Sequence, residues 1–451
     1  MHAVYCPQIK ENSMATLFRL NDDTFWQWMA DVYNNNGSGI KRCLALIQDY
    51  SIDTQYIVEL SSNNSIYTGK SKMEKLRGCL PARYFHEVHY CIGVYSAILG
   101  RLFPPLVSDI EQLAYIEWLQ FTEPLHKNYR DHLTHIFKVA FVSDLFLSDP
   151  VFAKTVASYQ AKSDHFSKWC KVHKIPLAEW QRDNHWQEIV KIAFFIASLF
   201  HDIGYGYYHL QEYKQNICHL YPWLISADNI SFDIQSNSLM QSLPATFIKK
   251  YHYWLESSKI KNRENNIVLG FFRDCLPINH SIASTLFILD LAEKITNARA
   301  ISPELYTAFH LAAETIMIHD MIDKERWLHL TPHDIDETPI SGKEKRCHFI
   351  NKKNQKQFPM AISMVLFDQL SRWKSPILIP ECTIDSVNYR LGYENTYESL
   401  EIEIKETDSR KHIIIGAEKN GKKLRKVLEE ELRCVSNPNK LSFLDYDAEI
   451  T

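Results

Sequence analysis

Apolar residues recur at helical spacing over the middle of the chain, from about residue 111 to residue 375. They stand three or four positions apart over Ile110–Gln120 and Asp131–Leu147, which predicts two amphipathic helices. The stretch Trp186–Phe200 becomes apolar on almost every side towards its end, as expected for a helix at the centre of a bundle. Charged or turn-rich segments separate the predicted helices at residues 161–181, 236–265 and 331–357.

The pattern changes after Pro376, where strand spacing replaces helical spacing. Apolar residues alternate with glutamates over Leu400–Ile404, and residues 413–415 form a short β-branched run. One apolar helical face follows this run. We therefore predict a mostly α fold: an all-helical bundle with insertions at 111–375 and a small α+β appendage at 376–451. Residues 1–110 are predicted to be an accessory, mainly helical region.

Composition excludes several classes of protein. The 451 residues are 45% hydrophobic and 23% charged, with only 13 Gly and 17 Pro. This hydrophobic content is too high for a disordered chain, and the Gly and Pro content is too low for a collagen-like repeat or a low-complexity linker. Fifty basic residues against 54 acidic ones give a net charge of −4, so overall charge does not favour nucleic acid or anionic lipid as a partner.

The cysteines and apolar runs bear on the compartment. The ten cysteines form no C-x-x-C pair, so zinc-ribbon spacing is absent from the sequence. Scattered single cysteines are typical of a reducing compartment. The longest apolar run, Ile192–Phe200, is about half as long as a membrane span. The expectation is a soluble, cytoplasmic protein with no membrane partner.

The remaining unusual feature is the 20 histidines, several of which stand at the ends of apolar helices. In FIASLFHDIGYG a buried helix ends at adjacent His201 and Asp202, followed by Gly204 in a predicted terminating turn. Two polar residues at the end of a buried helix need partners, because an unpaired buried charge is costly. A metal ion would partner both at once, whereas a helix-capping pair with ordinary hydrogen bonds is the alternative.

Four further segments place a polar residue where a core apolar residue is expected. YRDHLTHIFKV carries His132 and His135, the helix HSIASTLFIL begins with His280, AAETIMIHD contains His319, and MVLFDQLSRW contains Asp368. Five helices would thus each direct an imidazole or carboxylate inward, which is how metal sites in bundle cores are built.

The ordered set H…HD…H…H…D resembles the HD-domain superfamily of metal-dependent phosphohydrolases over roughly residues 110–375. HIFKVAFVSDL is similar to the first-histidine helix of that family, LFHDIGY to its central motif and NHSIASTLFIL to its third motif. The gaps of 66 residues (201 − 135) and 78 residues (280 − 202) imply sizeable insertions. Tyr205 stands where the family often has a lysine, which puts a lysine contact to phosphate in doubt.

The resemblance implies a dinuclear centre of divalent transition metal ions. One ion would be held by His135, His201, Asp202 and Asp368, and Asp202 would bridge to a second ion held by His280 and His319. This donor set favours Mn or Fe, with Ni, Co and Zn also compatible, and is not typical of Mg or Ca. Two such ions about 3.5–4 Å apart activate a bridging water and clamp phosphoryl oxygens.

The residues alone do not decide which histidine is the first metal ligand or which side chains contact phosphate. His135 is favoured over His132 as the ligand, which leaves His132 beside the metals or facing substrate. Arg130 is the first candidate for phosphate contact, ahead of Arg273 and Lys138, and a salt bridge to Asp131 is its alternative role. The predicted catalytic residues are therefore Asp202, Arg130 and His132. The remaining histidine pairs, His86 with His89 and His329 with His333, are interpreted as hydrogen-bonded or surface residues.

The leading functional hypothesis is a phosphohydrolase that cleaves a phosphate ester or anhydride of a nucleotide or related small compound with a metal-activated water. Nucleic acid is the less favoured substrate, and the oligomeric state stays open. One alternative is a di-iron oxygenase of the HD superfamily. Another is a non-catalytic HD scaffold that binds a nucleotide or a partner protein.

Overall fold

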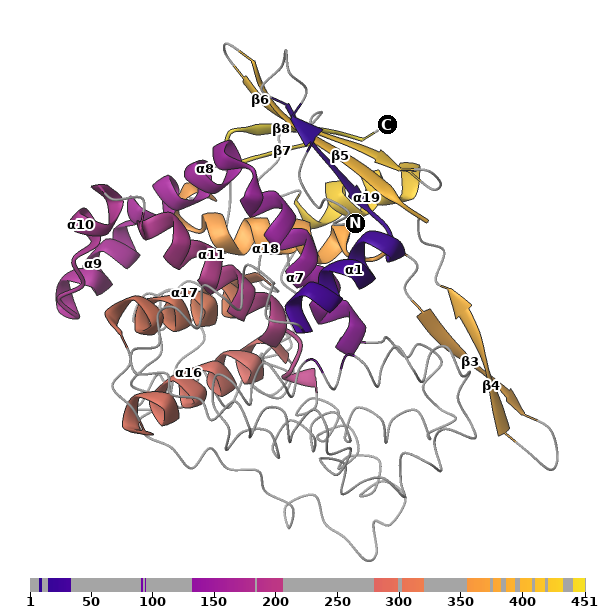
Figure 1. Ribbon diagram of the computed structural model, residues 1–451, viewed down its shortest axis with the longest axis horizontal. Helices are drawn as coiled ribbons and strands as arrows, with labels where there is room; N and C mark the ends of the chain where they lie inside the picture. The colour runs from indigo at the N-terminus through magenta and orange to yellow at the C-terminus, as the bar shows by residue number, and fades with distance from the viewer. Residues whose placement is uncertain are drawn as a thin grey trace, which may run out of the picture.

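Helices dominate the molecule, and a sheet built mainly from C-terminal segments packs against one side of them (Figure 1). In the computed structural model, the described residues are 8–9, 15–33, 91, 94, 132–182, 185–205, 280–298, 302–319, 355–373, 376–382, 387–393, 398–407, 410–417, 421–432 and 441–450. The predicted mostly helical fold with a small α+β appendage is confirmed.

The helical part is a bundle whose centre is α11. This helix contacts α7, α8, α17 and α18, and every residue from Ile192 to Phe200 is buried, as the sequence predicts. The helices of this part are α1 (Asp22–Tyr33), α7 (His132–Ser148), α8 (Pro150–Ala161), α9 (Asp164–Val172), α10 (Leu177–Arg182), α11 (His185–Phe200), α16 (His280–Ala298), α17 (Pro303–His319) and α18 (Pro359–Leu370), with a short 3-10 turn, η7 (Gln355–Gln357), before α18.

One predicted separator between helices is wrong. Residues 161–181, expected to be a charged or turn-rich connection, contain the short helices α9 and α10. Phe166 and Trp180 are buried there, and the ring of Phe166 stacks on Trp186 of α11 with 5.3 Å between ring centroids. Because these aromatic anchors bury so much apolar surface, they order a segment whose charged outer face suggested a loop.

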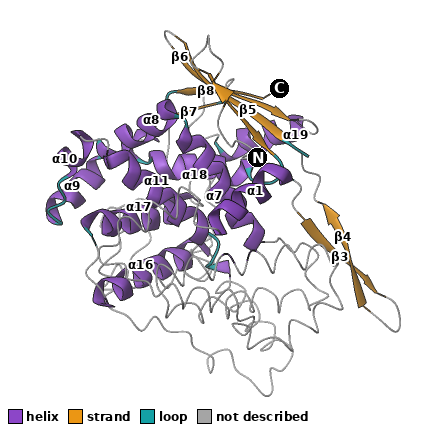
Figure 2. Cartoon of the chain, viewed as in Figure 1, coloured by secondary structure: helices purple, strands orange, loops and turns teal. Residues whose placement is uncertain are grey.

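The main sheet has the strand order β1-β2-β5-β6-β8-β7. Neighbouring strands are antiparallel except for β6 and β8, which are parallel. The strands are β1 (Gln8–Ile9), β2 (Ala15–Leu20), β5 (Leu400–Thr407), β6 (Arg410–Ala417), β7 (Ser442–Phe443) and β8 (Tyr446–Ile450), and α19 (Gly421–Glu431) contacts β8 and α18. Figure 2 shows this sheet on one side of the helices.

The inner face of the sheet is formed by alternating apolar residues, as strand spacing predicts. Leu400, Ile402 and Ile404 are buried, with 2% exposure or less. The N-terminal strand β2 pairs with β5 along its whole length, in the register Ala15↔Lys405 to Leu20↔Leu400. The N-terminal region thus contributes strands as well as the helix α1, and it shares a sheet with the C-terminal appendage.

Hydrogen bonds from the N-terminal elements tie the sheet to the bundle. Thr16 Oγ1 in β2 donates to Asp149 Oδ2 at 2.6 Å, and the other oxygen of Asp149 caps α8 by accepting from the Phe152 amide at 2.7 Å. The indole of Trp28 in α1 donates to Asp144 Oδ2 in α7 at 3.1 Å. These bonds fix the N-terminal elements on the bundle.

The predicted boundary near residue 376 carries a separate hairpin. Strands β3 (Pro376–Cys382) and β4 (Val387–Tyr393) pair antiparallel as a two-stranded sheet. The division at residues 110 and 375 stays a prediction, and the predicted helix Ile110–Gln120 lies outside the described residues. None of the described helices is both long and apolar enough to cross a membrane.

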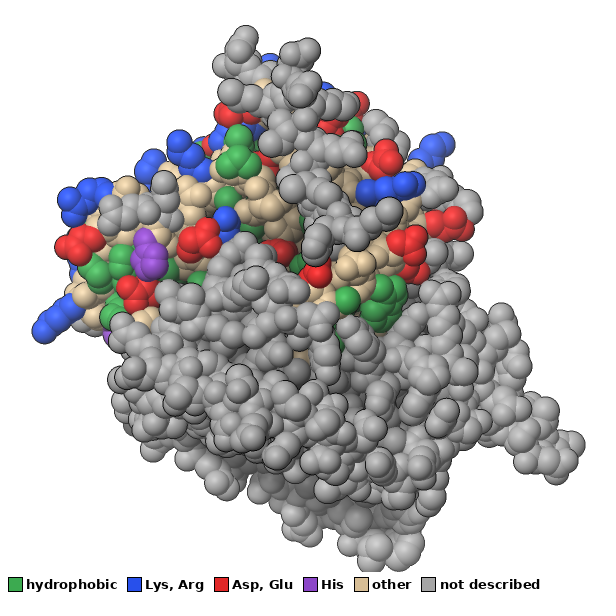
Figure 3. Space-filling view, in the orientation of Figure 1, with side chains coloured by type: hydrophobic (Ala, Val, Ile, Leu, Met, Phe, Trp, Pro, Cys, Tyr) green, Lys and Arg blue, Asp and Glu red, His purple; other side chains and the backbone are tan. Residues whose placement is uncertain are grey.

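On the face drawn in Figure 3, the described surface carries Lys and Arg side chains interspersed with Asp and Glu. This distribution agrees with the near balance of 50 basic and 54 acidic residues in the whole chain.

Candidate metal centre

Five helices bring the six predicted ligand residues to one place in the bundle. His135 lies in the first turn of α7, and His201 and Asp202 directly follow the last residue of α11. His280 is the first residue of α16, His319 is the last residue of α17, and Asp368 lies near the end of α18. The structure therefore brings together side chains that are up to 233 residues apart in the sequence.

The turn after α11 is held against the start of α16 by Gly204 and Ser284. The Ser284 hydroxyl donates to the His201 carbonyl at 2.7 Å and accepts from the Gly204 amide at 2.8 Å. A Cβ atom at Gly204 would overlap the His280 carbonyl oxygen and lie 2.7 Å from the Ser284 amide nitrogen. Only glycine allows this close approach of two backbones, which places His280 beside Asp202.

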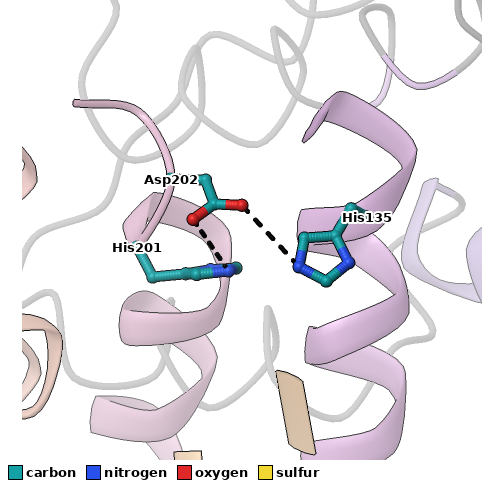
Figure 4. Close-up of side chains that lie close together, drawn as sticks. All are labelled: His135, His201 and Asp202. Atoms are coloured by element: carbon teal, nitrogen blue, oxygen red, sulfur yellow. Dashed lines mark ion pairs between the residues drawn. The ribbon is translucent and has the colours of Figure 1, made fainter. Parts of the chain in front are cut away.

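The side chains form two groups that can hold a metal ion, and Asp202 belongs to both. The first group is His135, His201 and Asp202, drawn in Figure 4, and the second is Asp202, His280 and His319; within each group the ligand atoms lie within 4.8 Å of one another. Asp202 Oδ1 is 3.3 Å from His201 Nε2 and 3.4 Å from His280 Nε2, while Oδ2 is 3.7 Å from His135 Nε2. A carboxylate shared in this way can bridge two ions.

Asp368 lies beside the first group and contacts His135. Its Oδ1 is 2.7 Å from His135 Nε2, and its Oδ2 accepts from Arg372 at 2.8 Å and from the Gln369 amide at 2.8 Å. The Asp368 carboxylate thus joins His135 to the Arg372 guanidinium, and its role as a ligand of the first ion stays a prediction.

Backbone carbonyls fix the protonation of two of the histidine rings. His201 Nδ1 lies 2.8 Å from the Ser198 carbonyl oxygen, and His319 Nδ1 lies 2.5 Å from the Ile316 carbonyl oxygen. A carbonyl oxygen can only accept a hydrogen bond, so Nδ1 carries the proton in both rings. In the neutral form of each ring Nε2 then keeps its lone pair for a metal ion.

A serine fixes His135 in the same way. The Ser371 hydroxyl donates its one proton to the Asp368 carbonyl oxygen at 2.7 Å, so its oxygen accepts from His135 Nδ1 at 3.2 Å. His135 Nε2 is the atom that faces Asp202 and Asp368. Asp368 Oδ1 lies 2.7 Å from it and can only accept, so this hydrogen bond places a proton on Nε2 as well, which a metal ion at that nitrogen would replace. Nδ1 therefore carries a proton in three of the four predicted histidine ligands.

Two further observations indicate that the centre fits a cation. His201 Nε2 is fully buried and makes no hydrogen bond, although Asp202 Oδ1 lies 3.3 Å away at an unsuitable angle. The 2.7 Å contact of His135 Nε2 with Asp368 Oδ1 needs positive charge at the nitrogen, which a proton supplies and which a metal ion bound there could supply in its place. These residues fit a divalent transition metal ion, whose preferred ligands are imidazole nitrogen and carboxylate oxygen.

Burial and charge move the pKa values of these groups in different directions. Burial is the largest effect on His135 and lowers its pKa, against the opposing pull of Asp368 and Asp202. Burial also acts to lower the pKa of His201, but the negative charges of Asp202 and Asp368 outweigh it and the pKa is raised. For Asp368, burial is outweighed by Arg372 and His135, which hold its pKa well below the ordinary value.

The structure locates only some of the other predicted site residues. Arg130 and Arg273 lie outside the described residues, and so do the histidines at positions 86, 89, 329 and 333. His132 begins α7, but its side chain is not among those described. The Lys138 ammonium is buried, donates to the Trp373 carbonyl at 2.8 Å and lies 4.8 Å from the centroid of the Trp373 ring, so it is engaged in packing.

Sequence reasoning missed residues that support the ligands. Ser284, Ser371 and Arg372 carry no motif of their own, although Arg372 stands four residues after Asp368, a spacing at which the two side chains can meet. Tyr205, which stands where the HD superfamily often has a lysine, stacks on the His280 ring with 4.0 Å between centroids and 13° between planes. The stack restricts the orientation of this imidazole.

Comparison of the chain with known proteins found no match. No family model matches the chain, and neither a curated protein nor a solved structure matches it. The structure shows a helical protein with two adjoining His/Asp groups that could hold metal ions.

Proposed function

We propose that the chain is a metal-dependent phosphohydrolase of the HD superfamily that acts on a nucleotide or a related small phosphate compound. The observation that carries the proposal is the position of Asp202, whose carboxylate belongs to both candidate metal groups. Together with the order of the ligands along the chain, a shared aspartate of this kind supports a dinuclear centre. Mn or Fe are the favoured ions.

When bound, two divalent ions would activate a water molecule and withdraw charge from phosphoryl oxygens. His135, His201 and Asp202, with Asp368 beside them, would hold the first ion, and Asp202, His280 and His319 the second. The residues that contact the histidine ligands have a specific task in this proposal. Ser371 and the carbonyls of Ser198 and Ile316 keep Nε2 of three histidines directed inward.

Burial of the centre supports binding of the metal ions on which the proposed hydrolysis depends. The side chain of His201 is 1% exposed and that of Asp202 is 8% exposed, so little water competes for their polar atoms. Charges act more strongly in such a water-poor site than in solution. The ligands therefore provide a fixed negative and nitrogen-rich environment that favours binding of cations and, through them, of phosphate.

A small substrate is favoured over nucleic acid. Phosphate backbones are bound mainly by clusters of Lys and Arg, which give strong dependence on salt. Here the whole chain has a net charge of −4, and the described surface of one face mixes both signs (Figure 3). We infer that the binding energy for the substrate comes from the metal centre and its surroundings and not from a broad basic surface.

The test is phosphate release from the Mn- or Fe-loaded full chain over nucleotides, cyclic nucleotides, dinucleotides and short nucleic acids. We expect release from at least one small compound, and loss of that release in Asp202→Asn. Asp164→Asn, which alters an exposed aspartate in α9, is the matched control. Release from none of them would contradict the proposal, and oxygen uptake by the iron-loaded protein would instead favour the di-iron oxygenase.

A further inference from the structure

We propose that Lys138 is a positioning residue for the first metal group, which consists of His135, His201 and Asp202. It acts by holding residues 371–373, the segment that follows α18, against α7, and not by contact with phosphate. The inference rests on the metal centre of the proposed function and adds to it a residue outside the H…HD…H…H…D set. Lys138 lies on α7 three residues after His135, a spacing at which two side chains share one face of a helix.

The Lys138 ammonium is buried against Trp373. Lys138 is 5% exposed, and its Nζ donates to the Trp373 carbonyl at 2.8 Å. The same atom lies 4.8 Å from the centroid of the Trp373 ring and 5.9 Å from that of Phe25. Burial of an ammonium is costly, whereas an apolar side chain of similar length would fill the same space without that cost. The bond to the carbonyl therefore explains a lysine at this position better than packing alone does.

Trp373, which receives this bond, is an anchor between α1 and α7. Its side chain is fully buried, and its ring lies edge-on to Phe25 of α1 and Phe141 of α7, with 6.1 Å and 6.0 Å between ring centroids. Its indole nitrogen donates to Asp22 Oδ1 at 3.2 Å. These contacts hold the side chain of Trp373, whereas the bond from Lys138 holds its backbone.

The segment 371–373 also contains the serine that orients a predicted metal ligand. Ser371 stands two residues before Trp373, and its hydroxyl oxygen accepts from His135 Nδ1 at 3.2 Å. The segment is thus joined to α7 at two levels, by Ser371 with His135 and by Trp373 with Lys138. On α7 the two levels are about 4.5 Å apart along the helix axis. Loss of the Lys138 bond would therefore free the backbone that presents Ser371 to His135.

The test is the metal affinity of the full chain, measured by competition with a chelator, in a double-mutant cycle of Lys138 and Ser371. We expect Lys138→Met, which keeps the apolar part of the side chain and loses the ammonium, to bind the first ion about tenfold more weakly. Adding Lys138→Met to Ser371→Ala should weaken binding little further, because both changes act on His135 through the same segment. A general loss of stability would instead add to the effect of Ser371→Ala.

Lys411→Met is the matched control. Lys411 of β6 also donates to an oxygen, Thr155 Oγ1 of α8 at 2.6 Å, and lies 5.8 Å from the centroid of the Tyr446 ring. Neither β6 nor α8 carries a predicted ligand, so this variant should keep the metal affinity of the unaltered protein. Lys138→Arg, which keeps the charge and changes the reach of the side chain, should give an intermediate affinity. It takes the place of Lys138→Met in the cycle if that variant does not fold.

Three outcomes would overturn the inference. One is unchanged metal affinity in Lys138→Met, and another is full additivity of the Lys138 and Ser371 substitutions. The third is an equal loss of affinity in Lys411→Met, because the loss would then follow from stability alone. Failure of the proposed function looks different: metal affinity would depend on Lys138, but no phosphate compound would be hydrolysed.

Discussion

The helical bundle and the sheet bury different kinds of side chain. Between α7, α11, α16, α17 and α18 the buried residues include histidines and an aspartate, whereas the inner face of the sheet is made of residues such as Leu400 and Ile402. In the sheet, burial of apolar surface needs no partner beyond another apolar side chain. In the bundle, the buried polar atoms need hydrogen bonds or ions, because each unpaired one is costly. The bundle core therefore contains polar groups that could bind a metal ion, whereas the buried face of the sheet is stabilised by apolar contacts.

The largest expected effect comes from Gly204→Ala, because it adds a methyl group where the backbone of the turn after α11 meets the backbone of α16. The added methyl would overlap the His280 carbonyl, so α16 must move away from the turn that holds Asp202. We expect a loss of about 3 kcal/mol in the free energy of unfolding. The metal group that contains His280 should be lost as well, as measured by elemental analysis.

Ser284→Ala is the comparison for this change. It removes the hydroxyl that links Gly204 to His201 but introduces no overlap. A cost of about 1 kcal/mol for lost hydrogen bonds is expected, with the metal ions retained. Equal effects of the two substitutions would show that the close backbone approach at Gly204 is unimportant.

Ile402→Ala tests whether the sheet stabilises the protein without affecting the metal groups. Ile402 is 0% exposed in the centre of β5, and its removal should cost about 2–5 kcal/mol by chemical denaturation. Metal content should stay unchanged in the fraction that remains folded. Ile414→Ala, on the neighbouring strand β6 but half-buried, should cost clearly less. A fall in metal content per folded Ile402→Ala molecule would contradict the separation of roles.

Much of the bundle could be predicted because each ligand interrupts or ends an apolar helix. His201, His319 and Asp368 are polar residues in positions of core periodicity, which is a local signal. The pairing of β2 with β5 had no such signal, because the partner strand lies some 380 residues away and strand spacing does not specify a partner. Ser371 was missed for a similar reason: its contact with His135 spans 236 positions.

Ser371→Ala separates metal affinity from stability within the bundle. The substitution removes the acceptor of the His135 Nδ1 proton, so the ring is no longer held with Nδ1 protonated and Nε2 directed at the centre. We expect about 10–100-fold weaker metal binding at the first group, measured with a competing chelator. Ser148→Ala, which removes a hydroxyl bonded to the Leu145 carbonyl in the same helix as His135, is the control. Equal affinity in both variants would exclude a role for Ser371.

The smallest expected effect is a dependence of metal affinity on pH. The pKa of His201 is raised by Asp202 and Asp368 against the effect of burial, so in the metal-free protein its ring gains a proton at a pH above the ordinary histidine value of about 6.5. A metal ion must displace that proton. Affinity should therefore begin to fall at a pH above this value as the solution is acidified. Constant affinity from pH 8 down to about 6 would contradict the assignment of His201.

The central claim is that one buried aspartate joins two metal groups, and elemental analysis of the full chain tests it most directly. The protein purified with Mn or Fe should contain close to two ions per chain, and Asp202→Asn should lose most of both. His185→Ala, at the opposite end of α11 from His201, should keep the full content. Retention of both ions in Asp202→Asn, or loss of only one, would contradict the account.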